Sequence, residues 1–231
     1  MTNQTQQKKY ELLKDDTINH NGRTLYRIKA LISFGLVVAG KLGGYVEKES
    51  NLDQNGYAWV YDNARVCGNA EVCGNAEVYG SAEVCGNAWV YDNARVYDNA
   101  RVYDNARVYD NARVCGNAEV CGNAEVYGNA EVYGSAEVCG NAWVYGNARV
   151  CGSAVISERK MIFWASNVGT EIGTLTVFNG KDGLIVTRGC FVGTVEDFLA
   201  KSAEVHDEKT KREYQLLIKV AKSRILDTTT E

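Results

Sequence analysis

The chain has 231 residues, with 25 basic and 29 acidic side chains and a formal net charge of −4. That balance gives no general attraction to nucleic acid, so we expect a partner of another kind. Charged residues run through the first thirty positions, and no apolar run reaches membrane-spanning length. These features predict a cytoplasmic protein that has neither a signal peptide nor a membrane anchor.

Residues 1–54 form the first predicted unit. The stretch 9–31 alternates in polarity as a β-hairpin does, and His20-Asn21-Gly22 is a typical turn within it. The glycine-bearing stretch 40–46 then leads toward the repeats that follow. Because a stack of repeats leaves an unpaired edge and an open core at each end, we expect this unit to be an N-terminal β cap.

Residues 55–156 consist of copies of one six-residue unit, V-[Y/C]-[D/G]-[N/S]-A-x. A valine occurs at every sixth position from Val60 to Val150, and Ile156 closes the series of seventeen. The chain contains no proline. A stacked parallel sheet needs nearly every backbone N–H as a donor, which proline lacks, so the composition agrees with a β-solenoid.

Each unit predicts one short strand and one corner. Ala64 and Val66 flank Arg65, so both apolar side chains point inward while the arginine points outward, and Asp-Asn, Gly-Asn or Gly-Ser then tolerates a left-handed corner. The unit resembles the hexapeptide repeat of left-handed parallel β-helices, in which three units make one coil. That resemblance implies a mainly β protein with a triangular, left-handed parallel β-helix of about six coils of 18 residues, about 4.8 Å apart. A right-handed helix with six-residue strands is the alternative.

Stacking at eighteen residues predicts three outward faces along the helix. Acidic and basic side chains alternate on these faces beside columns of tyrosine and cysteine, which suggests ion pairs between coils worth about 0.2–1 kcal/mol each. Stacked tyrosines also have a purely structural use, because tyrosine favours strands and packs well on its own copies. If these faces bind a partner, the candidate residues are Trp59, Trp89, Trp143, Tyr91, Tyr109, Tyr127, Tyr145, Arg95, Arg107 and Arg113.

Seven of the eight cysteines occupy the repeat position that tyrosine otherwise fills. This substitution pattern predicts packing or surface chemistry in place of a disulfide framework. Cys67 and Cys85 should stack on adjacent coils, as should Cys121 and Cys139. A flat column supplies too few converging ligands for a metal ion, so we expect no metal site.

Residues 157–231 form a predicted C-terminal α+β module. Three apolar segments predict a small sheet with one hairpin turn: 161–165, 174–178 and 184–191, with the turn at 179–183. The stretch from Thr194 to Asp197 resembles a capping box that opens a helix through about Val205. A second helix is predicted by the spacing of Tyr214, Leu217, Ile218 and Ala221.

The sequence favours a non-enzymatic function over an enzymatic one. Hexapeptide-repeat folds host acyltransferases and a zinc-dependent carbonic anhydrase class, which use histidines, but His20 and His206 both lie outside the repeat. Cys190, Arg188 and His206 could form a nucleophile and base, although a cysteine beside phenylalanine is more often a small core residue. We expect no catalytic residues and no cofactor, with an acyltransferase-like enzyme as a minor alternative.

Several stretches resemble a family of uncharacterised hexapeptide-repeat proteins from bacteriophages and prophages: LYRIKAL, LGGYVEKESNL and NGYAWVYDNARV, then TVFNGKDGLIV, GCFVGTVEDF and the H-x(7)-Y element from His206 to Tyr214. The resemblance covers essentially the whole chain. The number of hexapeptides varies between members of the family. The resemblance implies no established reaction.

Two hypotheses for function follow. In the first, the protein is a non-enzymatic, phage-encoded binding protein that acts in counter-defence, by engaging a host protein or by sequestering a nucleotide signal. Tyrosine, tryptophan and arginine would then supply stacking and charge. In the second, it is a structural, self-assembling scaffold. Long rows of exposed aromatic residues also favour a homo-oligomer.

Overall fold

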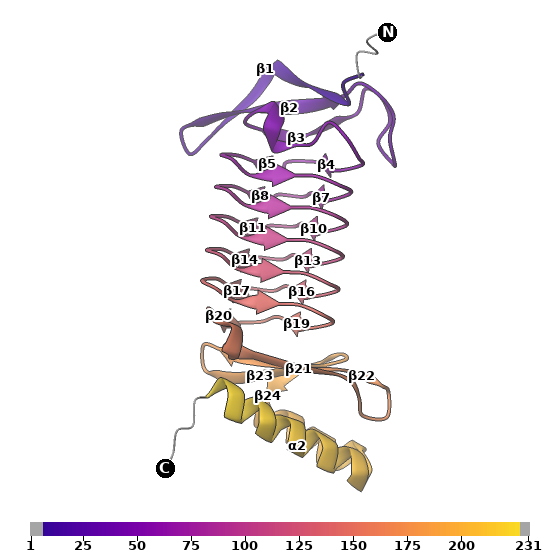
Figure 1. The fold of residues 1–231 in the computed structure, drawn as a ribbon, viewed down its shortest axis with the longest axis vertical. Helices are drawn as coiled ribbons and strands as arrows, with labels where there is room; N and C mark the ends of the chain where they lie inside the picture. The colour runs from indigo at the N-terminus through magenta and orange to yellow at the C-terminus, as the bar shows by residue number, and fades with distance from the viewer. Residues whose placement is uncertain (1–6, 227–231) are drawn as a thin grey trace, which may run out of the picture.

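The computed structural model describes residues 7–226 and shows an elongated, mainly β molecule (Figure 1). A stack of parallel coils lies between an N-terminal β-sheet layer and a C-terminal module of one sheet and two helices. The fold class expected from the sequence is therefore confirmed: a parallel β-solenoid of about six coils with a β cap and an α+β module at its ends.

Two-residue strands recur every six residues and form three parallel sheets, one for each face of the solenoid. The first face contains β4 (Trp59–Val60), β7 (Glu77–Val78), β10 (Arg95–Val96), β13 (Arg113–Val114), β16 (Glu131–Val132) and β19 (Arg149–Val150). The second contains β5 (Arg65–Val66), β8 (Glu83–Val84), β11 (Arg101–Val102), β14 (Glu119–Val120), β17 (Glu137–Val138) and β20 (Val155–Ile156). The third contains β6 (Glu71–Val72), β9 (Trp89–Val90), β12 (Arg107–Val108), β15 (Glu125–Val126) and β18 (Trp143–Val144).

The register between coils is eighteen residues, as predicted. Val102 pairs with Val84 on one side and with Val120 on the other. The repeat valines and the alanines two residues before them have no exposed surface, so they form one continuous apolar interior. At the corners, aspartates such as Asp98 adopt positive φ (61°), and glycines fill the same place in other units.

The N-terminal cap extends one solenoid sheet by three strands. Its hairpin consists of β1 (Tyr10–His20) and β2 (Arg23–Ala30), and β3 (Leu42–Val46) pairs antiparallel with β2 and parallel with β5. The short 3-10 helix η1 (Glu49–Asn51) then leads into the first coil. The cap thus covers the upper end by continuing the backbone ladder of the second face.

Two glycines allow β3 to approach the first coil. A Cβ at Gly43 would lie 2.5 Å from the Val60 carbonyl oxygen, and one at Gly44 would lie 2.5 Å from the Ala64 carbonyl oxygen. Trp59 is buried under the same cap, with edge contacts to Tyr10 at 6.1 Å and to Phe34 at 5.4 Å between ring centroids. The expectation that Trp59 belongs to an exposed binding surface is wrong, because the cap covers the first coil.

The C-terminal module closes the lower end of the solenoid. The 3-10 helix η2 (Arg159–Met161) precedes an antiparallel sheet of β21 (Ile162–Val168), β22 (Gly173–Gly180), β23 (Gly183–Arg188) and β24 (Phe191–Thr194). Phe178 and Ile162 contribute to the solenoid core, and the buried Thr187 hydroxyl donates to the Arg149 carbonyl at 2.9 Å. Because side chains of the sheet satisfy polar groups of the last coil, the sheet acts as a cap.

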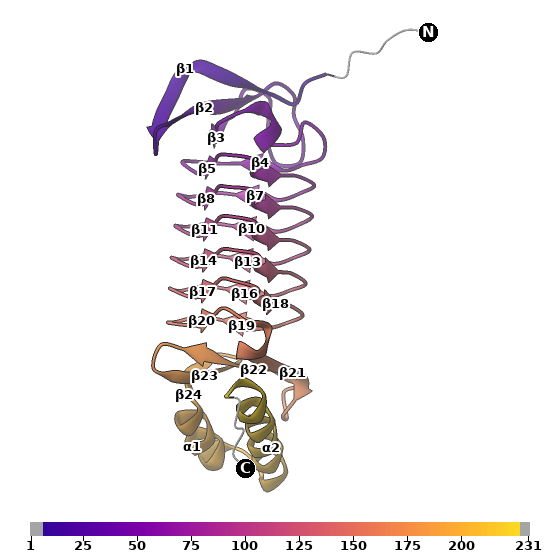
Figure 2. The ribbon, with the colours of Figure 1, turned by 60° about the vertical axis from the view of Figure 1, so that its left-hand side comes forward.

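Two helices cover the side of this sheet that faces away from the coils (Figure 2). Helix α1 (Val195–Val205) begins at Thr194, whose hydroxyl accepts a hydrogen bond from the Asp197 N–H at 3.1 Å, so the predicted capping box is confirmed. Helix α2 (Glu208–Ile225) buries Tyr214, Ile218 and Ala221 against the sheet, as their spacing predicted.

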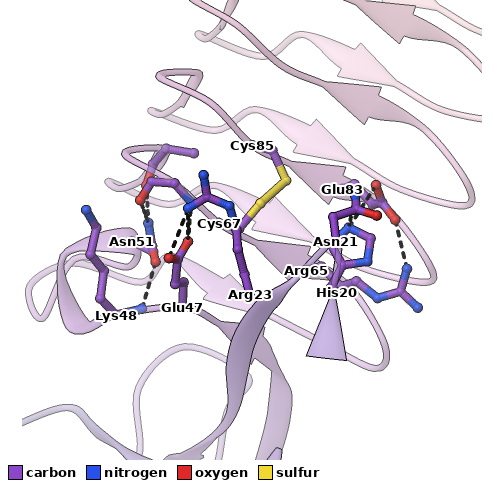
Figure 3. Close-up of a disulfide and its surroundings, with 12 residues drawn as sticks. His20, Asn21, Arg23, Glu47, Lys48, Asn51, Arg65, Cys67, Glu83 and Cys85 are labelled. Atoms are coloured by element: carbon purple, nitrogen blue, oxygen red, sulfur yellow. Dashed lines mark hydrogen bonds and ion pairs between the residues drawn. A yellow bond between two sulfur atoms is a disulfide. The ribbon is translucent and has the colours of Figure 1, made fainter. Parts of the chain in front are cut away.

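The structure contains two disulfides, Cys67–Cys85 and Cys121–Cys139, both on the second face (Figure 3 shows the first). The Cα atoms of each pair are 4.7 and 4.5 Å apart, respectively, within the range that a disulfide spans. The expectation that the cysteines form no bridges is therefore wrong for four of the eight. The physical reason is the register: two cysteines on one face, eighteen residues apart, are adjacent strand neighbours.

The continuous interior predicts that a charge within it is not tolerated. Val102→Asp should destabilise the fold by more than about 4 kcal/mol, because the carboxylate has no partner among the buried valines. Chemical denaturation monitored by circular dichroism measures this. The matched control is Arg101→Asp, whose carboxylate points outward and should cost about 1 kcal/mol. Equal unfolding midpoints for the two variants would contradict the assigned interior.

The disulfides predict a redox-dependent stability. Reducing one bridge that closes an eighteen-residue coil should lower the free energy of unfolding by about 3 kcal/mol. Cys67→Ser should show the same loss without reductant, whereas Cys73→Ser, at the same repeat position with a free thiol, should change little. Thiol titration in denaturant should detect four of the eight cysteines. Eight reactive thiols in the unreduced protein would refute the bridges.

Candidate functional site

The third face carries a ladder of stacked tyrosines beside its strands. The ring centroids of Tyr91 and Tyr109 lie 4.9 Å apart, those of Tyr109 and Tyr127 also 4.9 Å, and those of Tyr127 and Tyr145 5.0 Å. All four side chains come from the same repeat position, so the eighteen-residue register places each ring above the next. We call these four residues the tyrosine ladder.

Two tryptophans flank the tyrosine ladder on the same face. Trp89 is 45% exposed and meets Tyr91 edge-on at 6.4 Å, and Trp143 meets Tyr127 in the same way at 6.5 Å. Both occupy the outward position of their unit, where glutamate or arginine stands on most other strands. The ladder and these two indoles therefore form a surface with broad aromatic faces and edges, suited to contact with planar groups.

The arginines of the repeat differ between the faces. Arg65, Arg95, Arg101, Arg113 and Arg149 lie on the first two faces, and each forms an ion pair with a glutamate of a neighbouring coil, at N–O distances from 2.8 to 3.7 Å. Arg107 lies on the third face, and within residues 7–226 it has no acidic partner. Its guanidinium lies 5.8 Å from the Trp89 ring centroid.

The acidic residue that pairs with Arg107 in strand register forms no ion pair with it within residues 7–226. Glu125 pairs with Arg107 in strand register, but its carboxylate accepts the Tyr109 hydroxyl at 2.9 Å. Burial raises the pKa of Tyr91 and Tyr127, and burial together with the bond to Glu125 raises that of Tyr109. Tyrosine hydroxyls are uncharged at neutral pH in any case. The charges around the ladder are therefore the Arg107 guanidinium and the carboxylates of Asp92, Asp110 and Glu125.

The third face ends in a hollow of about 370 Å³ between the last coil and the C-terminal module. In Figure 2, β21 lies directly below β18. Trp164 from β21 meets the Tyr145 ring edge-on at 4.1 Å, and Arg159 lies 3.3 Å from the Trp143 ring centroid. Arg224 of α2 completes the wall. The hollow therefore continues the tyrosine ladder with two more arginines and one more indole.

The structure brings together most of the predicted surface residues but not all. Trp89, Trp143, Arg107 and the tyrosine ladder share the third face, whereas Arg95 and Arg113 lie on the first face in ion pairs with Glu77 and Glu131. Three further residues of this surface, Arg159, Trp164 and Arg224, were not predicted from the sequence. No periodic signal points to them, because they lie outside the repeat and reach the third face only through the packing of the module.

Residues considered for catalysis lie apart from this surface. His20 of the N-terminal hairpin lies 3.4 Å from the Glu83 carboxylate, beside the Cys67–Cys85 bridge (Figure 3). Cys190 is exposed, so the expectation that it packs in a core is wrong: it lies in the turn between β23 and β24, with Arg188 and His206 around one hollow. Within the described chain, no hydrogen bond joins its thiol to the imidazole.

Residues 7–226 lack two other features, a cluster of metal ligands and a membrane-spanning helix. No cluster of three or more histidine, cysteine, aspartate and glutamate side chains has the arrangement of a metal site. None of the helices in this part of the chain has the length and apolar character needed to cross a membrane.

The fold defines the class: this is a repeat β-solenoid protein with a distinct module at each end. Within that class, the coils are similar to the family described as YdcK beta solenoid repeat, whose model matches residues 88–104, 94–109, 100–116, 106–122 and 142–158. The matches lie almost entirely within the repeat and cover β9 to β14 and β18 to β20. No curated protein matches the chain.

Proposed function

We propose that this protein is a non-enzymatic binding protein whose third face holds a planar, anionic ligand of the nucleotide type. The observation that carries this proposal is that the tyrosine ladder shares one face with Arg107, which has no ionic partner among the described residues. The first two faces also have tyrosines, for example Tyr79 stacked on Tyr97 at 4.8 Å, but glutamates there neutralise the repeat arginines.

We place the base of such a ligand in the hollow below β18. Stacking a base on an aromatic side chain is worth about 1–3 kcal/mol, and Trp143 and Trp164 both line the hollow. Arg159 and Arg224 stand at the same hollow, and neither has an acidic partner in the described residues. Two guanidinium groups near two indoles match a flat ring that carries phosphate.

The resemblance to phage and prophage proteins supports a role against a bacterial host. In that setting, a protein that sequesters a nucleotide signal needs affinity and abundance but no chemistry on the ligand. We propose counter-defence by sequestration of this kind. Engagement of a host protein by the same face is the competing form of the binding hypothesis.

The first experiment is native recovery of the protein from expressing bacteria, followed by mass spectrometry of molecules released by heating. We expect a phosphate-bearing, ultraviolet-absorbing compound with the wild-type protein. Trp143→Ala should lower its recovery at least about fivefold, because one stacking partner is lost. The matched control is Tyr79→Ala, which removes a stacked ring from the first face and should leave recovery unchanged.

Two results would overturn the nucleotide proposal. One is a protein that is recovered empty and does not bind added ATP in calorimetry. The other is a specific host protein whose capture depends on Trp89, which would assign the third face to a protein partner. Thermal unfolding of each variant is measured in parallel, since Trp89 is exposed and should contribute little to stability, whereas Trp143 is half-buried and packs on Arg159.

A self-assembling scaffold is the second candidate function, and one observation favours it. The loop between β2 and β3 exposes Leu36 (89%) and Val38 (63%), and Gly35 of the same loop lies against the exposed Tyr57. These apolar side chains lie at the N-terminal end of the molecule. Surfaces of this kind favour contact with a second copy.

Light scattering at increasing protein concentration tests the scaffold. We expect a mass that grows with concentration and that falls to one constant value in Leu36→Ser with Val38→Ser, because the apolar contact is removed. Ile172→Ser is the matched control, since Ile172 is equally apolar and exposed but lies at the other end. A wild-type mass that does not change with concentration would exclude this assembly.

A further inference from the structure

A second hollow, of about 220 Å³, lies within the C-terminal module and away from the third face. Its walls come from the turn between β21 and β22, the turn between β23 and β24, helix α1 and the start of α2. The volume is below the range of about 300–1,000 Å³ that is usual for drug-sized ligands. The hollow therefore suits a small molecule.

Arg188, the last residue of β23, supplies a buried positive charge to this hollow. Its side chain is only 10% exposed, one terminal nitrogen donates to the Val168 carbonyl at 3.1 Å, and its Nε is buried without a partner. Within residues 7–226, the only carboxylate paired with it is Glu171, at 3.6 Å, and that side chain is 82% exposed. Burying a guanidinium beside a largely exposed carboxylate costs desolvation free energy. A second anion close to the guanidinium would offset that cost.

Two glycines make the space for this arrangement. A Cβ at Gly173 would lie 2.4 Å from a terminal nitrogen of Arg188, and one at Gly169 would lie 2.0 Å from the Tyr214 hydroxyl. Both glycines border the turn between β21 and β22. Any other residue at these positions would displace the arginine or the tyrosine, so the backbone itself is shaped around these two side chains.

The rest of the lining includes both apolar and basic side chains. Phe198 contacts Phe191 and Tyr214, with ring centroids 5.4 and 5.0 Å away, and forms an aromatic wall. Lys201 and His206 line the opening, and the His206 Nδ1 is held 3.2 Å from the Ser202 hydroxyl. An anionic group and an apolar group could thus be accommodated by different side chains of the same hollow.

We propose that this hollow binds a small organic acid, with its carboxylate on Arg188 and its apolar part against Phe198 and Tyr214. Arginine presents a planar fork of donors that matches a carboxylate. On binding, the ligand takes the place that the Glu171 carboxylate holds in the free protein. This site is separate from the proposed nucleotide surface, so either can fail without the other.

Benzoate is the probe, and isothermal titration with the full chain is the measurement. We expect benzoate to bind and the neutral isostere benzamide not to bind. Glu171→Gln should tighten benzoate binding by up to about fivefold, because it removes the competing carboxylate. A misfolded variant cannot produce this gain. Glu204→Gln removes an exposed carboxylate from α1 and should leave the affinity unchanged.

Cys190 provides an independent readout, because its exposed thiol lies at the hollow. Benzoate should slow its alkylation by iodoacetamide, measured by peptide mass spectrometry, without slowing that of Cys73 in the solenoid. The proposal is overturned if benzoate fails to bind to the wild type and to Glu171→Gln, and also fails to protect Cys190 in both proteins. It is also overturned if benzamide or inorganic phosphate binds as tightly as benzoate. The site would then not require both a carboxylate and an apolar ring.

Discussion

The eighteen-residue backbone ladder is the constraint on which the rest of the structure depends. The Arg101 N–H donates to the Ala118 carbonyl at 2.9 Å, the Tyr103 N–H donates to the Val120 carbonyl at 3.0 Å, and the same pattern repeats along the coils. Because each unit then lies above the unit eighteen residues earlier, a residue type repeated at that spacing forms a column along the solenoid. Stacked tyrosines, inter-coil ion pairs, disulfides and rows of asparagine amides such as Asn69 to Asn87 all follow from this register.

The two end modules do more than cover exposed core. The N-terminal hairpin lies over part of the second face and buries Cys67, and the loop after β2 helps to bury Trp59. The C-terminal module adds Trp164 and Arg224 to the end of the third face. The third face thereby combines a long aromatic ladder, a hollow and an arginine that has no ion pair within residues 7–226. This difference arises where the repeat meets non-repeated sequence.

The net charge of the chain is small, but its charged side chains are distributed differently over the faces and the C-terminal module. On the first two faces, glutamates and arginines of neighbouring coils neutralise one another. Two arginines differ from this pattern within residues 7–226. Arg107 on the third face lies beside an indole without an acidic partner, and Arg188 in the C-terminal module is buried while its partner Glu171 is largely exposed. We propose different ligands for the two places, a flat phosphate-bearing ring for the first and a small carboxylate for the second.

The six-residue period, with valine and alanine inward, was enough to predict a β-solenoid. The eighteen-residue register came from the resemblance to left-handed parallel β-helices, and the pairing of Val102 with Val120 confirms it. Local rules were enough to predict the hairpin turns and the Thr194 capping box. Tertiary structure decided what the period cannot express. Trp59 and Trp89 occupy the same repeat position, yet one is buried by the cap and the other is exposed. The hollows at Trp164 and Arg188 depend on how non-repeated segments pack, and that packing joins residues that have no common spacing in the sequence.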